Sequence, residues 1–73
     1  MSFASRIRER RKALGITKAK LAKLAGLTRP SITRYEKGLT KNPNAHSLER
    51  LADVLGVTAD YLLGRGSNFK RRS

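Results

Sequence analysis

The sequence predicts an all-α fold, a compact bundle of five short helices. Its 73 residues are enough for one domain with one modest core. Apolar residues recur at helical spacing in successive segments that are bounded by capping residues or glycines, and strand-like alternation is almost absent. We expect residues 1–64 to form the domain and residues 65–73, which are basic and without periodicity, to form a mobile tail.

The first two expected helices are joined by a short connection. The first covers residues 3–14 and ends at Gly15, and the second begins after the Thr17 cap and ends at Gly26. Both place apolar side chains on one face, which is expected to pack against the core. These side chains are Phe3, Ile7 and Leu14 in the first helix, then Leu21, Leu24 and Ala25 in the second.

The third expected helix, within "LTRPSITRYEKG", has an unusual first turn. Thr28 suits the N-cap of this helix, and Pro30 suits its first turn. Gly38 suits the end of the helix. The helix dipole favours an acid near the N-terminus, yet this turn carries Arg29 and no acid. The cation costs an isolated helix roughly 0.3 to 1 kcal/mol, so it indicates an anion in front of the helix. The expected inward side chains are Ile32 and Tyr35.

The fourth and fifth expected helices follow a polar turn at residues 42–44. The fifth begins at the Thr58 cap, and the fourth ends at Gly56. His46, the only histidine, stands near the start of the fourth helix without a second ligand, so no metal site is expected. The apolar positions of the fourth helix are Leu48, Leu51, Ala52 and Leu55.

The net charge of +12 is distributed unevenly along the chain. Residues 1–41 hold 12 Lys and Arg against 2 acids, whereas residues 42–64 hold 1 Arg against 3 acids. A one-sided excess of this kind fits a polyanion, either nucleic acid or an anionic membrane surface. A cationic membrane-surface peptide is disfavoured because the basic residues lie on several helices that each keep a separate core stripe.

Enzymes, cofactor proteins and membrane-spanning proteins are not predicted. The chain has no cysteine, one histidine and five acids, and these form no carboxylate pair, triad or metal cluster at a useful spacing. Its apolar runs are only a few residues long, and its charged beginning lacks the apolar region of a signal peptide. We expect a cytoplasmic protein with no cofactor and no small-molecule substrate.

One charged residue interrupts the core stripe of the first helix. Arg11 lies four residues after Ile7 and three before Leu14, where a buried guanidinium needs an acidic partner. Glu36 offers that partner from an inward-facing position on the third helix. The alternative is that Arg11 extends along its aliphatic stem to solvent.

At these residues the chain resembles a known family. The run "ITKAKLAKLAGLTRPSITRYEKG" resembles the helix-turn-helix of lambdoid phage repressors and Cro, the Xre-type DNA-binding domains. The resemblance continues through "SLERLADVLGVTADYLLG" and covers about residues 3–64. It implies a lambda repressor-like domain that binds double-stranded DNA as a homodimer, with the third helix in the major groove, and that is nucleoid-associated when bound. The half-sites of a pseudo-palindromic operator would lie about 34 to 36 Å apart.

The resemblance also assigns residues to bases and phosphates. Arg29, whose fork matches guanine O6 and N7, is expected to read a base, and Pro30 can give only apolar contact. Thr33 suits a phosphate contact as well as a base contact. Arg34 is either a base contact or only an exposed cation of the helix. The implied base-contacting residues are Arg29, Pro30, Thr33 and Arg34. The expected phosphate contacts are Thr17, Lys18, Thr28, Ser31, Lys37 and Lys41.

Several assignments stay open at the level of sequence. Val57, Thr58 and Tyr61, with Leu62 beside them, belong either to the core or to a dimer interface. Lys41 is nearly as well explained as a solvated loop lysine. The leading function is a dimeric, sequence-specific repressor. The alternatives are an antitoxin or restriction-modification controller with a protein partner, and a nonspecific nucleic-acid binder.

Overall fold

The computed structural model describes residues 3–40 and 43–64, which form five helices and no strand. The predicted Lys41 contact and the expected tail at residues 65–73 lie outside the described residues. The helices are α1 (Phe3–Ala13), α2 (Lys18–Ala25), α3 (Arg29–Glu36), α4 (Ala45–Leu55) and α5 (Ala59–Leu62). The predicted all-α class and the order of the five helices are thus confirmed.

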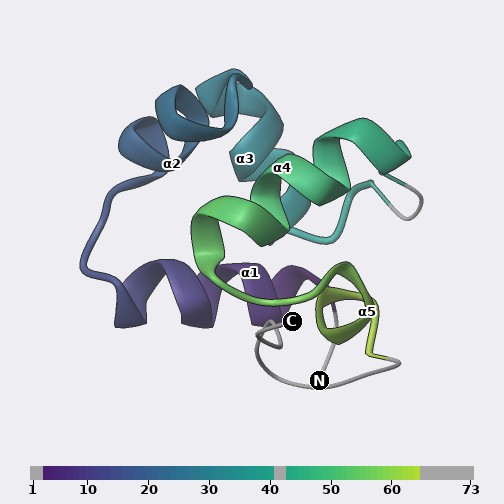
Figure 1. Cartoon of the computed structure of the whole chain (residues 1–73). Coiled ribbons are helices and arrows are strands. Elements are labelled where there is room, and N and C mark those ends of the chain that lie inside the picture. Colours follow the sequence, from purple (N-terminus) through teal and green to yellow (C-terminus); the bar gives the residue numbers. More distant parts are fainter. Residues whose placement is uncertain (1–2, 41–42, 65–73) are drawn as a thin grey trace.

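The helices form two tiers (Figure 1). The α2–α3 pair lies at the top of the view, α4 crosses the middle, and α1 and α5 lie below. Contacts link α1 to α3, α4 and α5, while α4 also packs against α2. The helix-turn-helix therefore rests on a base made by the other three helices.

Polar caps begin four of the helices. The Thr17, Thr28 and Thr58 hydroxyls accept hydrogen bonds from backbone N–H groups three residues later, at 3.0, 3.2 and 2.9 Å. The Asn44 side chain caps α4 in the same way. Gly26 ends α2 with a φ of +69°, a left-handed conformation that other residues adopt only with strain. These local signals explain why the helix boundaries could be predicted.

Every helix contributes to a single core. Its fully buried side chains come from all five helices and from the α4–α5 connection: Ile7, Leu21, Ile32, Leu51, Leu55, Val57 and Leu62. The aromatic edge of this core joins α1 to α3, where the Phe3 and Tyr35 rings meet edge to face with centroids 5.9 Å apart. Tyr35 is therefore a core residue, as predicted.

Two leucines that were expected in the core are exposed instead. Leu14 is 44% exposed because α1 ends at Ala13 and the chain turns away at Gly15, which leaves Ile16 partly buried against the core. Leu24 is 52% exposed, because Ala22 completes the inward stripe of α2 and leaves Leu24 at its edge. A helical spacing alone did not locate the centre of either stripe.

Candidate nucleic-acid interface

The outward side of α3 carries the four predicted base-contacting residues. Arg29, Pro30 and Arg34 are exposed and Thr33 is half-buried. The opposite side is buried and holds Ile32, Tyr35 and Glu36. Because one helix turn takes 3.6 residues, positions 29, 30, 33 and 34 form one continuous stripe. The structure brings these four residues together on a solvent-facing surface.

Hydroxyl groups shape the beginning of α3. The Thr28 hydroxyl lies 2.8 Å from that of Ser31 and also accepts the Ser31 backbone N–H. Ser31 then lines a small hollow of about 160 Å³ together with Arg34, Tyr35 and Thr40. Thr40 was missed by sequence reasoning, since a loop threonine has no spacing that would mark it. A guanidinium beside hydroxyl groups is suited to an anionic oxygen such as that of a phosphate.

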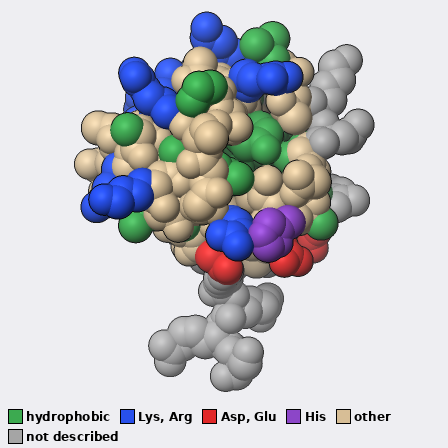
Figure 2. Space-filling model, turned by 90° about the horizontal axis from the view of Figure 1, so that it is seen from above, with side chains coloured by type: hydrophobic (Ala, Val, Ile, Leu, Met, Phe, Trp, Pro, Cys, Tyr) green, Lys and Arg blue, Asp and Glu red, His purple; other side chains and the backbone are tan. Residues whose placement is uncertain are grey.

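The N-terminus of α2 repeats the same chemistry. Thr17 caps the helix, and its first turn contains Lys18 and Lys20 but no acid. Lys20 is exposed and Lys18 half-buried, while Lys37 is exposed just after α3. Viewed from above the α2–α3 pair, Lys and Arg side chains spread over the face, and acidic side chains appear only at its lower edge (Figure 2). This face is therefore electropositive as well as exposed.

A buried ion pair holds α3 against α1. Arg11 Nε donates to Glu36 Oε2 at 2.7 Å and Arg11 Nη2 donates to Glu36 Oε1 at 3.1 Å. The side chains are only 11% and 3% exposed, so Arg11 does not extend to solvent. The hydrogen bond to the Glu36 carboxylate raises the pKa of Arg11 above its ordinary value, against the opposing effect of burial. The ion pair predicted from the sequence is present.

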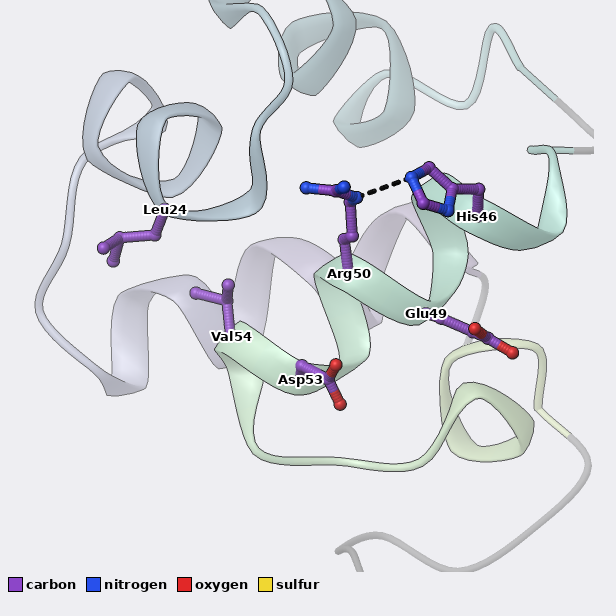
Figure 3. Close-up of a pocket in the computed structure, with 6 residues that line it drawn as sticks. All are labelled: Leu24, His46, Glu49, Arg50, Asp53 and Val54. Carbon is purple, nitrogen blue, oxygen red and sulfur yellow. Dashed lines mark hydrogen bonds between the residues drawn. The ribbon is translucent and has the colours of Figure 1, made fainter.

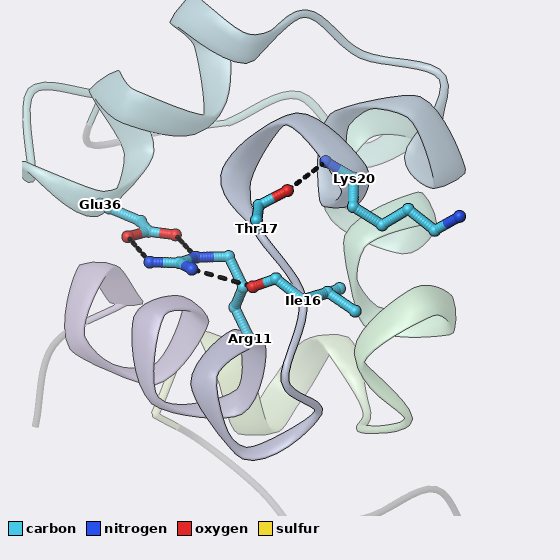
Figure 4. Close-up of polar contacts among 5 residues, drawn as sticks. All are labelled: Arg11, Ile16, Thr17, Lys20 and Glu36. Carbon is cyan, nitrogen blue, oxygen red and sulfur yellow. Dashed lines mark hydrogen bonds and ion pairs between the residues drawn. The ribbon is translucent and has the colours of Figure 1, made fainter.

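The same guanidinium also fixes the approach to α2. Arg11 Nη1 donates to the Ile16 carbonyl oxygen at 3.0 Å, one residue before the Thr17 cap (Figure 4). Arg11 thus links the end of α3 and the start of α2 through a single side chain. This contact adds a polar link between the two helices that form the electropositive face, which also pack directly against each other.

The remaining arginines on the inner side of α1 also have partners. Arg10 donates to the Leu55 carbonyl oxygen from Nε at 3.2 Å and from Nη2 at 3.0 Å, at the end of α4. The Arg6 guanidinium carbon lies 5.1 Å from the centre of the Tyr61 ring, a cation–π contact. Sequence reasoning counted both among the cations that suit a polyanion, but the structure gives them contacts within the fold.

The α2–α3 cations differ from Arg6, Arg10 and Arg11 of α1, which have partners within the fold. Their side chains form no hydrogen bond or ion pair with any other residue in the described ranges 3–40 and 43–64. They are Lys18, Lys20, Lys23, Arg29, Arg34 and Lys37. Their charges remain available for an external anion.

The residues considered for a dimer interface divide into two groups. Val57 and Leu62 are fully buried and belong to the core, so Val57 has no surface to offer a second copy. Thr58 caps α5, and Tyr61 is half-buried under the Arg6 guanidinium. Only Thr58 and Tyr61 keep part of their surface exposed.

His46 forms an arginine contact. Its Nε2 accepts a hydrogen bond from Arg50 Nε at 2.8 Å. Among the described residues, no three histidine or acidic side chains lie close enough together to hold a metal ion. Over the same residues, no helix has the length and apolar character that crossing a membrane requires.

The chain is similar in sequence to known helix-turn-helix proteins. A family model described as helix-turn-helix matches residues 7–62. The uncharacterized HTH-type transcriptional regulator YqaE of Bacillus subtilis is 35% identical over 68 residues, which make up 93% of this chain and 58% of YqaE. Repressor protein C2 of Salmonella phage P22 is 41% identical over 61 residues, 84% of this chain and 28% of the repressor. The chain thus spans little more than half of one relative and less than a third of the other.

The chain is also similar to solved structures of DNA-binding regulators. The P22 c2 repressor in complex with a synthetic operator has a TM-score of 0.82 and 38% identity, covering 86% of this chain and 94% of that chain. SinR of Bacillus subtilis, in a structure described as a complex with DNA, has a TM-score of 0.78 and 32% identity, covering 82% and 95% of the two chains. Both superpose over most of the described helices.

Proposed function

The chain belongs to the helix-turn-helix family, in its Xre-type group of repressor and Cro-like domains, and on that premise we propose that it is a sequence-specific transcriptional repressor domain. It binds double-stranded DNA with α3 in the major groove. The observation that carries the proposal is the outward stripe of α3, which presents Arg29 and Arg34 without partners among the described residues.

The stripe suits base readout for a physical reason. Arg29 stands at the N-terminus of α3, where the helix dipole already favours an anion. Its two-pronged guanidinium can donate to O6 and N7 of one guanine, a contact that discriminates by roughly 1 to 3 kcal/mol. Pro30 and Thr33 present apolar surface beside it, and a thymine methyl group is the matching base feature.

Phosphate contacts position the stripe on the duplex. The α2 N-terminus offers Lys18 beside the Thr17 cap, and the other side of α3 offers the hollow between Arg34 and Thr40. Backbone contacts on both sides of a recognition helix fix its register in the groove. Lys37 adds a third exposed cation near the end of α3.

The operator is proposed to be pseudo-palindromic and bound by a dimer. Thr58 and Tyr61 keep exposed surface near the α5 end of the molecule and supply the contact between copies. Two copies of α3 would then enter successive major grooves about 34 to 36 Å apart.

Selection from a pool of random duplexes at near-physiological salt tests this function. Nonspecific binding is then typically weak, at dissociation constants of about 10⁻⁴ to 10⁻⁶ M, so a preferred sequence stands out. We expect an enriched pseudo-palindrome with half-sites one helical turn apart. A pool without enrichment, bound in a way that disappears as salt rises, would instead identify a nonspecific nucleic-acid binder.

A further inference from the structure

Three helices are followed by a glycine of positive φ, and an arginine from another helix lies against each of these glycines. A Cβ at these glycines would lie 2.6 to 3.7 Å from a guanidinium nitrogen. A cation suits this place, because backbone carbonyl groups give the end of a helix a partial negative charge. The pairs are Gly26 with Arg50, Gly56 with Arg10 and Gly64 with Arg6. Of the three, the Gly26 pair is the one within the α2–α3 unit that carries the unpartnered cations.

The contact between Arg50 and Gly26 is close. Arg50 Nη1 lies 2.7 Å from where a Cβ on Gly26 would be, so the guanidinium takes the space that any side chain there would need. The Gly26 N–H donates to the Lys23 carbonyl oxygen at 3.3 Å. The Leu27 N–H donates to the Ala22 carbonyl oxygen at 2.8 Å. Backbone hydrogen bonds to α2 thus close the turn, and the guanidinium from α4 adds a restraint beyond the direct packing of α2 against α3.

One hydrogen bond holds the Arg50 guanidinium in this place. Its Nε donates at 2.8 Å to Nε2 of His46, which lies one turn earlier on α4. In Figure 3 the guanidinium lies between the imidazole and the turn after α2, whereas Glu49 and Asp53 point the other way. Arg50 forms no second hydrogen bond or ion pair with the other residues that the structure describes. His46 is therefore the polar partner that keeps the guanidinium against Gly26.

This hydrogen bond requires a neutral imidazole. Because Nε2 accepts, the ring proton of His46 is on Nδ1. A protonated imidazole has no acceptor, and its charge would stand beside the Arg50 guanidinium. His46 also lies in the first turn of α4, where the helix dipole opposes a cation. Histidine is the side chain that ordinarily changes charge between about pH 5 and pH 8, so acidification breaks this contact.

The other charged groups around His46 come from its own helix. Glu49, which is exposed three residues after His46, attracts an imidazolium, and Arg50 repels it. Asp53 is about two turns away along α4. The charged residues that line the surrounding hollow are Glu49, Arg50 and Asp53. Protonation of His46 is thus favoured by one exposed acid and opposed by the guanidinium that it holds.

Among the described residues, the helices packed against α4 add no further charge to this hollow. α4 packs mainly against α1, α2 and α5. From α2 the lining includes Leu24 but none of the lysines, and from α5 it includes neither Asp60 nor Tyr61. On α1, Arg10 lies at the opposite end of α4. A change of charge at His46 therefore acts mainly within α4.

We propose that Arg50 is a positioning residue for DNA binding and that His46 makes its contact with Gly26 sensitive to pH. The proposal rests on the DNA-binding function proposed above. With a neutral His46 the guanidinium restrains the turn, so the N-termini of α2 and α3 meet the duplex as one preorganised unit. Protonation releases the guanidinium and loosens the turn that precedes Arg29. Operator affinity should therefore fall on acidification, whereas an added positive charge alone would raise it.

The first test compares the affinity of the full chain for the selected duplex at about pH 7.5 and pH 5.5, at one salt concentration. We expect a loss in acid of about threefold for each half-site, the size that one exposed hydrogen bond can supply. In His46→Gln the amide oxygen can accept from Arg50 at either pH, so this variant should keep the higher affinity at both. Arg50→Met should bind weakly at both. Arg8→Met removes an exposed arginine of α1 and, as the matched control, should keep the pH dependence of the parent.

NMR of the isotopically labelled full chain without DNA gives a readout that does not depend on the duplex. The Gly26 amide resonance should follow the titration of the His46 ring in the parent and stay constant in His46→Gln. Gly56, which lies against Arg10 at the other end of α4, is the internal control and should not respond. A Gly26 resonance that does not follow the His46 titration would overturn the proposal.

The binding results separate this inference from the proposed function. Affinity that rises in acid would contradict the inference, because His46 would then act only through its charge. Equal pH dependence in the parent and in His46→Gln would place the titrating group elsewhere. A preferred operator that is bound equally at both pH values would overturn the inference alone. A chain that prefers no duplex sequence, while Gly26 still follows His46, would overturn the proposed function, and with it the role of Arg50 in DNA binding.

Discussion

Helix α1 and the α2–α3 pair are both rich in cations, but they use them differently. On α1, Arg10 and Arg11 donate to a carbonyl oxygen and a carboxylate within the fold. On α2 and α3, Lys18 and Arg29 have no such partner among the described residues and face outward. The comparison teaches that a basic composition has two sources here, one that assembles the helices and one that remains for a ligand. Substitutions of the partnered α1 arginines should therefore lower stability, whereas substitutions of the α2–α3 cations should lower DNA affinity.

The largest expected effect comes from breaking the ion pair on the α1 side. Glu36→Ala leaves Arg11 buried without its carboxylate and should lower the free energy of unfolding by about 3 to 5 kcal/mol. Thermal and urea unfolding followed by circular dichroism measures the loss. Glu9→Ala removes an exposed acid of α1 and serves as the control. Equal stability of the two variants would contradict the role given to Arg11 and Glu36.

The second-largest effect is expected from a substitution on α3, which should change DNA affinity without changing stability. Arg29→Ala removes the proposed guanine contact and should cost about 1 to 3 kcal/mol of discrimination at one base pair in each half-site. Binding to the selected operator and to single-base variants measures it, while the melting temperature should not fall. If all sequences were weakened equally, Arg29 would be a phosphate contact.

A smaller stability effect is expected at the junction of α1 and α4. Arg10→Ala removes both hydrogen bonds to the Leu55 carbonyl oxygen at the end of α4 and should destabilise the fold by about 1 kcal/mol. Arg8, exposed on the same helix, gives the matched control Arg8→Ala. Unfolding curves that coincide for the two variants would show that the Arg10 contact does not stabilise the fold.

The smallest effect should be seen at a single phosphate contact. Lys18→Ala should weaken operator and random duplex alike and reduce the slope of log K against log salt by about 0.9 for each phosphate that is no longer neutralised. Lys12→Ala, which removes an exposed lysine of α1, should leave the slope unchanged. A change confined to the operator would instead mean that Lys18 takes part in base readout.

The sequence predicted the features that depend on neighbouring residues along the chain, and it predicted one buried ion pair. The caps at Thr17, Thr28 and Thr58 need only local residues, and the Arg11–Glu36 pair was deduced because one charge on a core stripe requires another. The outward stripe of α3 followed from helical spacing and the family resemblance.

Other features depend on contacts that leave no mark in the sequence. The Arg10 partner is a backbone carbonyl, which any residue at position 55 would provide. The exposure of Leu14 and Leu24 depends on where each helix ends and on how it rotates toward the core. Arg50 covers Gly26 only because α4 packs beside the turn between α2 and α3. These contacts require the three-dimensional arrangement.

The division of the cations between the fold and the ligand is tested most directly by one matched pair of arginine variants. For both variants, the free energy of unfolding and the operator affinity are measured together. The pair is Arg11→Met on the α1 side and Arg29→Met on the α3 side, which both remove a guanidinium and keep an aliphatic side chain. We predict that Arg11→Met loses stability but retains affinity per folded molecule, whereas Arg29→Met retains stability and loses operator affinity. Equal losses of both quantities in the two variants would contradict the division of the cations between the fold and the ligand.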